Sequence, residues 1–328
     1  MLTTTLLLSL LAPPQRADTG QALFGKWCGS CHGADGRGGS KTMTRLEVPA
    51  ADLAACANST AETEERWVGI VRNGGSAYGL SIDMPAFGEN ATAEQIRAVV
   101  RYARGFCADR RWPPGELNFP RAFLAEKAFP ENELVLTEHA RAQELIYERR
   151  FGPSMQIEAV ARSVFDGGSV FGGVTGAFKY NVYHNLDRRL IASLGAEATP
   201  PIGRQDLWEG ETYLAFGARP GAVVMQGEAI ATWEEGTGFA GFTVNLGLGH
   251  GVGRFVPQLE GAWTIPRGGS GQTLALVPQL WFRLSRLGHV AGSLGVELPA
   301  AGPQPRGGPK LIAFLLWDFG DAPLNRGW

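Results

Sequence analysis

Cysteine, methionine and histidine are scarce in this chain of 328 residues, which has four, five and five of them. A close grouping of such rare residues is therefore not expected by chance. The net charge is only −2 with both signs interspersed, which excludes the basic surface of a nucleic-acid-binding protein. No activated nucleophile, carboxylate pair or open metal-binding group stands out either, so the sequence predicts no enzyme activity and no catalytic residue.

One grouping, Cys28-Gly29-Ser30-Cys31-His32, predicts chemistry. Two cysteines separated by two residues and followed by histidine form the pattern of covalent haem attachment. Each thiol bonds one haem vinyl group, and His32 then lies under the iron as its proximal ligand. A reducible Cys-x-x-Cys pair would have no use for the histidine. Since this pattern occurs once in the chain, we expect a single covalent haem c.

The iron also needs a sixth ligand, for which methionine is common in electron-transfer proteins. Met84 is the favoured candidate, because Pro85 places it in an extended loop from which its sulfur can be presented. Met43 lies in a polar stretch and is the weaker alternative. A structural role in the core is the other interpretation of Met84. The predicted cofactor site is therefore Cys28, Cys31, His32 and Met84, with His32 and Met84 as iron ligands.

Residues 19–107 resemble the class I c-type cytochromes. The resemblance lies in Gly20–Phe24 before the cysteines, in Arg72–Gly75 and Met84–Phe87, and in a closing helix from Thr92 to Arg104. Thr92 and Gln95 predict a capping box for that helix. The resemblance implies an all-α haem domain in which the last helix crosses the first, with a partly exposed haem edge for electron exchange. Full ligation by histidine and methionine leaves the iron no position for a substrate.

The amino terminus is consistent with export, since thioether attachment implies assembly outside the cytoplasm. Leu6–Ala12 is an apolar core of signal-peptide length and is too short to span a bilayer, so residues 1–17 are predicted to be a signal peptide. The remaining cysteines, Cys56 and Cys107, form a disulfide in an oxidising compartment or stay as buried thiols.

Beyond residue 107 the sequence changes character. Residues 108–130 are rich in proline and aromatic residues and predict a linker packed along a surface, and residues 131–328 follow with a period of two. About twelve strands of some ten residues are predicted in this last part, near residues 133–138, 142–151, 155–165, 173–184, 188–198, 210–219, 221–234, 240–249, 254–265, 273–285, 290–298 and 309–319.

These strands favour an antiparallel up-and-down barrel of the outer-membrane type over a soluble β-sandwich. One face of each strand is apolar, and the other carries polar residues and glycine, as expected of a wet lumen. The chain ends on an aromatic, Trp328, as outer-membrane barrels commonly do. His184, His250 and His289 are interpreted as polar lumen residues without a metal. Aromatic residues near strand ends predict interfacial girdles, with candidates Tyr147, Phe151, Tyr183, Trp208, Tyr213, Trp233, Trp263 and Trp317.

The leading functional hypothesis is an electron carrier tethered in the outer membrane, with a haem domain on the periplasmic side. Its architecture resembles cytochrome and porin fusions of bacterial electron exchange. A redox protein or a small electron donor or acceptor is the expected partner, together with the membrane and without nucleic acid. A redox-linked transport pore and a periplasmic cytochrome with a β-sandwich docking module remain the alternatives.

Overall fold

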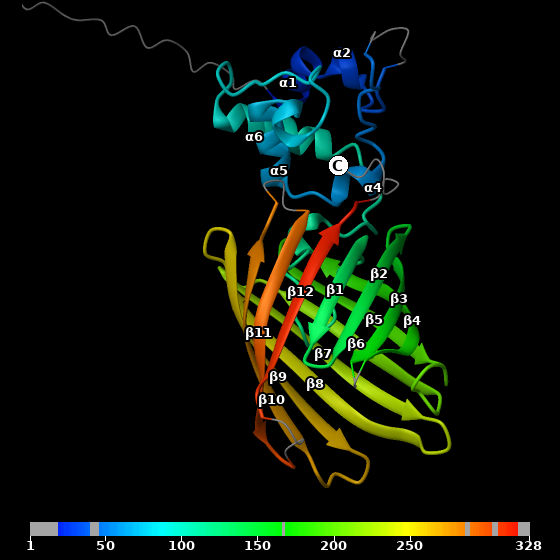
Figure 1. Cartoon of the computed structure of the whole chain (residues 1–328). Helices are drawn as coiled ribbons and strands as arrows, with labels where there is room; N and C mark the ends of the chain where they lie inside the picture. Colours follow the sequence, from blue (N-terminus) through cyan, green and yellow to red (C-terminus); the bar gives the residue numbers. More distant parts are fainter. Residues whose placement is uncertain (1–18, 40–45, 166–167, 286–288, 304–307, 321–328) are drawn as a thin grey trace, which may run out of the picture.

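The protein has a helical part at the rim of a β-barrel (Figure 1). This computed structural model describes residues 19–39, 46–165, 168–285, 289–303 and 308–320. The predicted signal peptide at 1–17, Met43 and Trp328 lie outside the described residues.

The helical part is built from short helices whose ends follow from the local sequence. Helix α6 carries the predicted capping box, in which Gln95 N–H bonds Thr92 Oγ1 and Thr92 N–H bonds Gln95 Oε1. No helix of the described residues is long and apolar enough to cross a membrane. The helices are α1 (Gly20–Trp27), α2 (Gly29–His32), α4 (Cys56–Thr60), α5 (Glu64–Asn73) and α6 (Ala93–Arg104), with 3-10 turns η1 (Gly75–Tyr78) and η2 (Gly115–Leu117).

Helix α1 crosses α6 at Gly20, as the cytochrome resemblance implies. A Cβ at Gly20 would lie 2.2 Å from the Ala98 carbonyl oxygen, so only glycine permits this approach. The Phe24 ring then packs against Tyr102 and Phe106, with ring centroids 5.5 and 5.1 Å apart. The apolar stripe of α6 is buried at this crossing, which places the two helices on one shared core.

The second part is a closed antiparallel barrel of twelve strands, each paired with its neighbours in sequence and β12 paired with β1. The predicted strand number and up-and-down order are confirmed, and the β-sandwich alternative is wrong. The strands are β1 (Glu133–His139), β2 (Ala142–Phe151), β3 (Met155–Phe165), β4 (Ser169–Asn185), β5 (Leu190–Thr199), β6 (Glu209–Ala218), β7 (Val223–Glu234), β8 (Gly238–His250), β9 (Phe255–Pro266), β10 (Thr273–Arg283), β11 (Val290–Ala301) and β12 (Lys310–Asp318).

The two faces of the wall are as the alternation predicts. In β9, Phe255 and Leu259 are exposed on the outside, whereas Gln258 and Glu260 are buried in the lumen. Most predicted girdle aromatics, such as Tyr147, Trp208 and Trp233, are exposed on the outside. The prediction for Tyr213 is wrong, because this side chain is only 4% exposed and packs inside the lumen.

The segment before β1 does not pack along a surface as predicted, but enters the lumen. We call residues 117–132 the plug. Pro120 O accepts from Gln226 Nε2 of β7, the Phe123 and Leu124 N–H groups donate to Glu260 of β9, and Lys127 O accepts from Lys179 Nζ of β4. These polar lumen residues therefore satisfy the backbone of a segment that has no secondary structure of its own beyond η2.

Charge and shape fix the plug in place. Arg121 Nη1 lies 2.9 Å from Glu148 Oε1, and the two side chains are 8% and 0% exposed. Lys127 likewise pairs with Glu131 and Glu133. Glycines of the wall make room for aromatic rings, since a Cβ at Gly217 would lie 2.7 Å from Phe119 Cδ2. Gly217 thus permits close packing between the wall and the plug.

Candidate functional site

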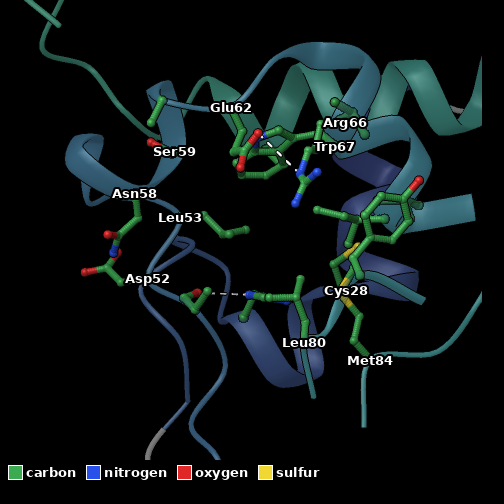
Figure 2. Close-up of a pocket in the computed structure, with 18 of the residues that line it drawn as sticks. Cys28, Asp52, Leu53, Asn58, Ser59, Glu62, Arg66, Trp67, Leu80 and Met84 are labelled. Atoms are coloured by element: carbon green, nitrogen blue, oxygen red, sulfur yellow. Dashed lines mark hydrogen bonds and ion pairs between the residues drawn. The ribbon is translucent and has the colours of Figure 1, made fainter. Parts of the chain in front are cut away.

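A cavity of about 370 Å³ lies in the helical part, between its core and the barrel rim. Apolar side chains of α1, α5 and α6 form most of its wall, among them Phe24, Ile70 and Val99. Three of the four predicted site residues, Cys28, His32 and Met84, line the same cavity (Figure 2). Cys31 is not among its lining residues, although it follows Cys28 by three positions in the same short turn.

The two thiols and the imidazole have different surroundings. Cys28 and Cys31 are unpaired and partly exposed. Burial, and then the neighbouring Cys31, raise the pKa of the Cys28 thiol to about 11. His32 Nδ1 lies 3.1 Å from the Ala51 carbonyl oxygen, which orients the ring and favours the tautomer with a proton on Nδ1. Nε2 is then left as the nitrogen that can bind a metal in the cavity.

Met84 is delivered by a loop that folds back onto the end of α5. Gly74, with φ of 82°, ends the helix, and Gly75 N–H donates to Met84 O at 3.0 Å. A Cβ at Gly75 would lie 2.3 Å from Ser81 O and 3.1 Å from Met84 Cβ. The Asn73-Gly74-Gly75 stretch of the resemblance therefore has a physical role, because it allows the methionine loop to approach closely.

The polar part of the cavity lies away from Cys28, as Figure 2 shows for Asn58, Ser59 and Glu62. Ser59 Oγ is buried and has no hydrogen-bond partner among the described residues. Glu62 pairs with Arg66 Nε at 3.3 Å. Burial raises the pKa of the Glu62 carboxyl, and the Arg66 guanidinium opposes this shift.

Sequence reasoning missed the contribution of the barrel to this cavity. His289, interpreted as a polar lumen residue, instead precedes β11 at the rim and lines the cavity, 2.9 Å from Arg66 Nη2. Nothing in the local sequence links the two, which are 223 residues apart.

Cys56 and Cys107 form a disulfide, as one of the two sequence interpretations expects. It ties the first residue of α4 to the segment just after α6, and both helices supply residues to the cavity wall. The bond therefore links two parts of that wall.

These residues fit a haem c. The cavity offers two thiols nearby, an oriented imidazole and a thioether within an apolar wall, which is the donor set that such a group needs. Ser59 Oγ is buried without a hydrogen-bond partner among the described residues, which indicates that a ligand bound in the polar part can form a hydrogen bond there. Met84 and His32 come from separate elements and line one cavity, so both would be available to ligate the iron of a haem bound there.

Residues 15–102 match the family model described as cytochrome c oxidase, cbb3-type, subunit III. The N-terminal part of this chain is a cytochrome c domain. The matched segment contains all four predicted site residues and the α1 and α6 crossing. This cytochrome c domain is joined to the closed barrel in one chain.

The barrel is similar in outline to several solved structures. The KdgM porin in complex with disordered oligogalacturonate is 9% identical, with a TM-score of 0.45, covering 57% of this chain and 98% of that chain. An outer-membrane channel from Pseudomonas putida F1 is 11% identical, with a TM-score of 0.43, covering 56% of this chain and 93% of that one. No curated protein matches the chain.

Proposed function

We propose that this protein is a membrane-tethered electron carrier, in which the barrel spans the outer membrane and the cytochrome domain faces the periplasm. The observation that carries the proposal is the convergence of Cys28, His32 and Met84 on one cavity of a cytochrome c domain. A haem bound there supplies a one-electron Fe(III)/Fe(II) couple. The chain's own residues bind it covalently at Cys28 and Cys31, ligate it through His32 and Met84, and keep water from it with the apolar wall.

The outer surface of the barrel supports the membrane part of the proposal. Large apolar side chains point outward from strand after strand, and many are about half exposed, as for Leu194 at 50%, Leu246 at 55% and Leu294 at 54%. A water-soluble surface does not expose so continuous an apolar band. A bilayer covers such a band, and closure of the barrel satisfies all strand edges within it.

The connections between strands support the periplasmic position of the cytochrome domain. β1 starts and β12 ends at the rim where this domain lies (Figure 1). The connections at this rim that are described in full are short, namely 152–154, 186–189, 219–222 and 251–254. The opposite rim has two short connections, 140–141 and 235–237, and the two longest of those described in full, 200–208 and 267–272. Outer-membrane barrels carry short turns on the periplasmic side and longer loops outside.

Electron exchange is proposed to occur at the thioether edge of the haem. Cys28 and Cys31 are partly exposed. Helix α2, which contains Cys31 and directly follows Cys28, lies on the side of the cytochrome domain away from the barrel (Figure 1). One iron cannot bridge an apolar band about 25 Å tall. The expected partner is therefore a soluble redox protein or small electron donor or acceptor on the same side of the membrane.

The plug argues against the transport alternative. Its residues bond to strands on opposite sides of the lumen, from Gln156 of β3 to Glu260 of β9. Liposomes that contain the protein should not leak small solutes, whether the haem is oxidised or reduced. Leakage that follows the redox state would favour the pore.

The direct test is to purify the protein from membranes in detergent and follow its haem. We expect a pigment that stays with the chain on a denaturing gel and titrates as a single one-electron couple. Cys28→Ala and Cys31→Ala should each weaken the attachment, and His32→Ala should leave the iron misligated. A colourless protein, or a pigment released by acidified acetone from the unmodified chain, would refute the proposal.

A further inference from the structure

The barrel rim forms part of the wall of the haem cavity. His289, just before β11, and Gly320, just after β12, both line the cavity. His289 has a side chain only 15% exposed, and it lies between the cytochrome domain and the barrel. Its position cannot be reproduced by a cytochrome domain alone.

His289 belongs to a row of polar contacts that starts in the cytochrome domain. Arg66 Nη2 lies 2.9 Å from His289 Nε2, Arg66 Nε lies 3.3 Å from Glu62 Oε2, and His289 Nδ1 lies 4.0 Å from Asp318 Oδ2. Because a guanidinium only donates, His289 Nε2 must accept, and the ring proton is then on Nδ1, toward Asp318. Burial, and then Arg66, lower the pKa of His289 to about 4, in agreement with a neutral acceptor.

The position of Arg66 matters because of the shape of haem. The thioether bonds and the two propionates leave opposite edges of the porphyrin. With the thioether edge at Cys28, the carboxylates would point to the polar part of the cavity, where Asn58, Ser59 and Glu62 lie, with Arg66 beside Glu62 (Figure 2). Arg66 brings a positive charge to this part, and Ser59 Oγ is buried without a partner among the described residues.

We propose that the barrel completes the haem site, with His289 as a positioning residue that holds the Arg66 guanidinium at the propionate edge. This inference rests on the proposed function, since it requires the haem. A fixed positive charge near the iron favours Fe(II), because reduction removes one positive charge. The rim loop thereby influences the reduction potential from outside the cytochrome domain.

The test compares reduction potentials of the purified holoprotein in detergent for His289→Ala, His289→Gln, Arg66→Gln and the double variant His289→Ala/Arg66→Gln. The matched control is His250→Ala, which removes an exposed histidine from the end of β8 at the same rim. Covalent haem content and the reduced spectrum are recorded for each protein, so that loss of haem is separated from a change in potential.

We expect Arg66→Gln to shift the Fe(III)/Fe(II) ratio at fixed solution potential about tenfold toward Fe(III), which is about 59 mV for one electron. His289→Ala should shift it in the same direction by a factor of roughly three, since the guanidinium keeps its Glu62 contact but loses the hydrogen bond to His289. His289→Gln keeps an acceptor and should stay close to the unmodified protein, as should His250→Ala. The reduction potential of the double variant should equal that of Arg66→Gln, because His289 acts through Arg66.

An unchanged potential in His289→Ala would overturn the inference, as would an equal His289→Ala effect in the Arg66→Gln background. Should His289→Ala fail to accumulate, His289→Leu takes its place against His289→Gln, because leucine fills space without accepting a hydrogen bond. Absence of covalent haem from the unmodified protein would instead refute the proposed function, before any variant is compared.

Discussion

Gly75 shows how a single residue can fix the position of the methionine loop at the site. Its missing side chain lets the backbone of the methionine loop lie against the end of α5, where Gly75 N–H donates to Met84 O. The proline neighbour predicted the loop position of Met84, and the cytochrome resemblance includes the glycines. Arg66 and Ser59 were not predictable, because a charged residue and a serine within short helices have no sequence signal until the cavity is assembled.

Met84→Ala should keep the covalent haem, lose the long-wavelength sulfur-to-iron absorbance and lower the reduction potential. Attachment depends on Cys28 and Cys31, whereas the thioether ligand raises the potential. The measurement is the oxidised spectrum with a redox titration. Met43→Ala, the alternative considered from the sequence, should leave both unchanged. The reverse result would assign the sixth ligand to Met43.

Acid should loosen the contact between the cytochrome domain and the barrel through His289. The folded imidazole has a pKa of about 4, below its ordinary 6.5, so the unfolded state binds the proton first as the pH falls. The stability of the contact is full above pH 6.5 and declines toward pH 4. Arg66 and Asp318 face the ring, and Glu62 pairs with Arg66. Protonation of Glu62, whose pKa burial raises, acts in the opposite sense.

Hydrogen–deuterium exchange of α5 checks this expectation, with His289→Gln measured at every pH. After correction for the intrinsic pH dependence of amide exchange, the protection of α5 should fall more in the unmodified protein than in the variant between pH 6.5 and 4. An equal fall in protection would show that His289 does not carry the effect.

At the scale of elements, one covalent bond links α4 to the segment after α6. The Cys56–Cys107 disulfide closes a loop with a sequence separation of 51. A loop of this size corresponds to roughly 4 kcal/mol in the chain-entropy model. Replacing both cysteines by alanine should lower the unfolding free energy of the cytochrome domain by about this amount. Denaturant titration followed at the haem absorbance measures it, and a difference within about 0.5 kcal/mol would contradict the expectation.

The plug is held by buried pairs of charges. Arg121→Ala would leave Glu148, which is 0% exposed, without its partner. Loss of one partner of a buried pair costs about 3–5 kcal/mol. The unfolding temperature of the barrel in detergent should therefore be clearly lower for Arg121→Ala than for the unmodified protein. Arg111→Ala, which breaks an exposed pair with Asp109, is the matched control and should leave it unchanged.

The strands were predictable and the plug was not, for a shared reason. Alternation in stretches such as Phe255–Glu260 fixes which residues face outward, whatever fills the interior. Glu260 and Gln258 were recognised as lumen residues, but the sequence does not distinguish a side chain that meets water from one that bonds to Phe123 or Arg121. Proline and aromatic residues in 108–130 excluded helix and strand without giving a location.

At the scale of the whole molecule, the proposed orientation places residues 108–114 between the cytochrome domain and the plug, in the periplasm. Protease added to intact cells should spare this stretch, and protease added after the outer membrane is opened should release a haem-containing fragment. Haem staining of membrane and soluble fractions reads the result. Release of the haem-containing fragment from intact cells would place the cytochrome domain on the outer surface instead.

The path of the plug has a consequence for assembly. It goes in at the rim near Leu117 and comes back to the same rim at Glu133, where β1 begins. A segment that entered at one rim and left at the other would be threaded through the barrel once the strands had closed. A segment that enters and leaves at the same rim is not threaded, so it can be inserted or withdrawn while the barrel stays closed. Wall closure and seating of the inner segment therefore need no fixed order, and neither leaves a knot.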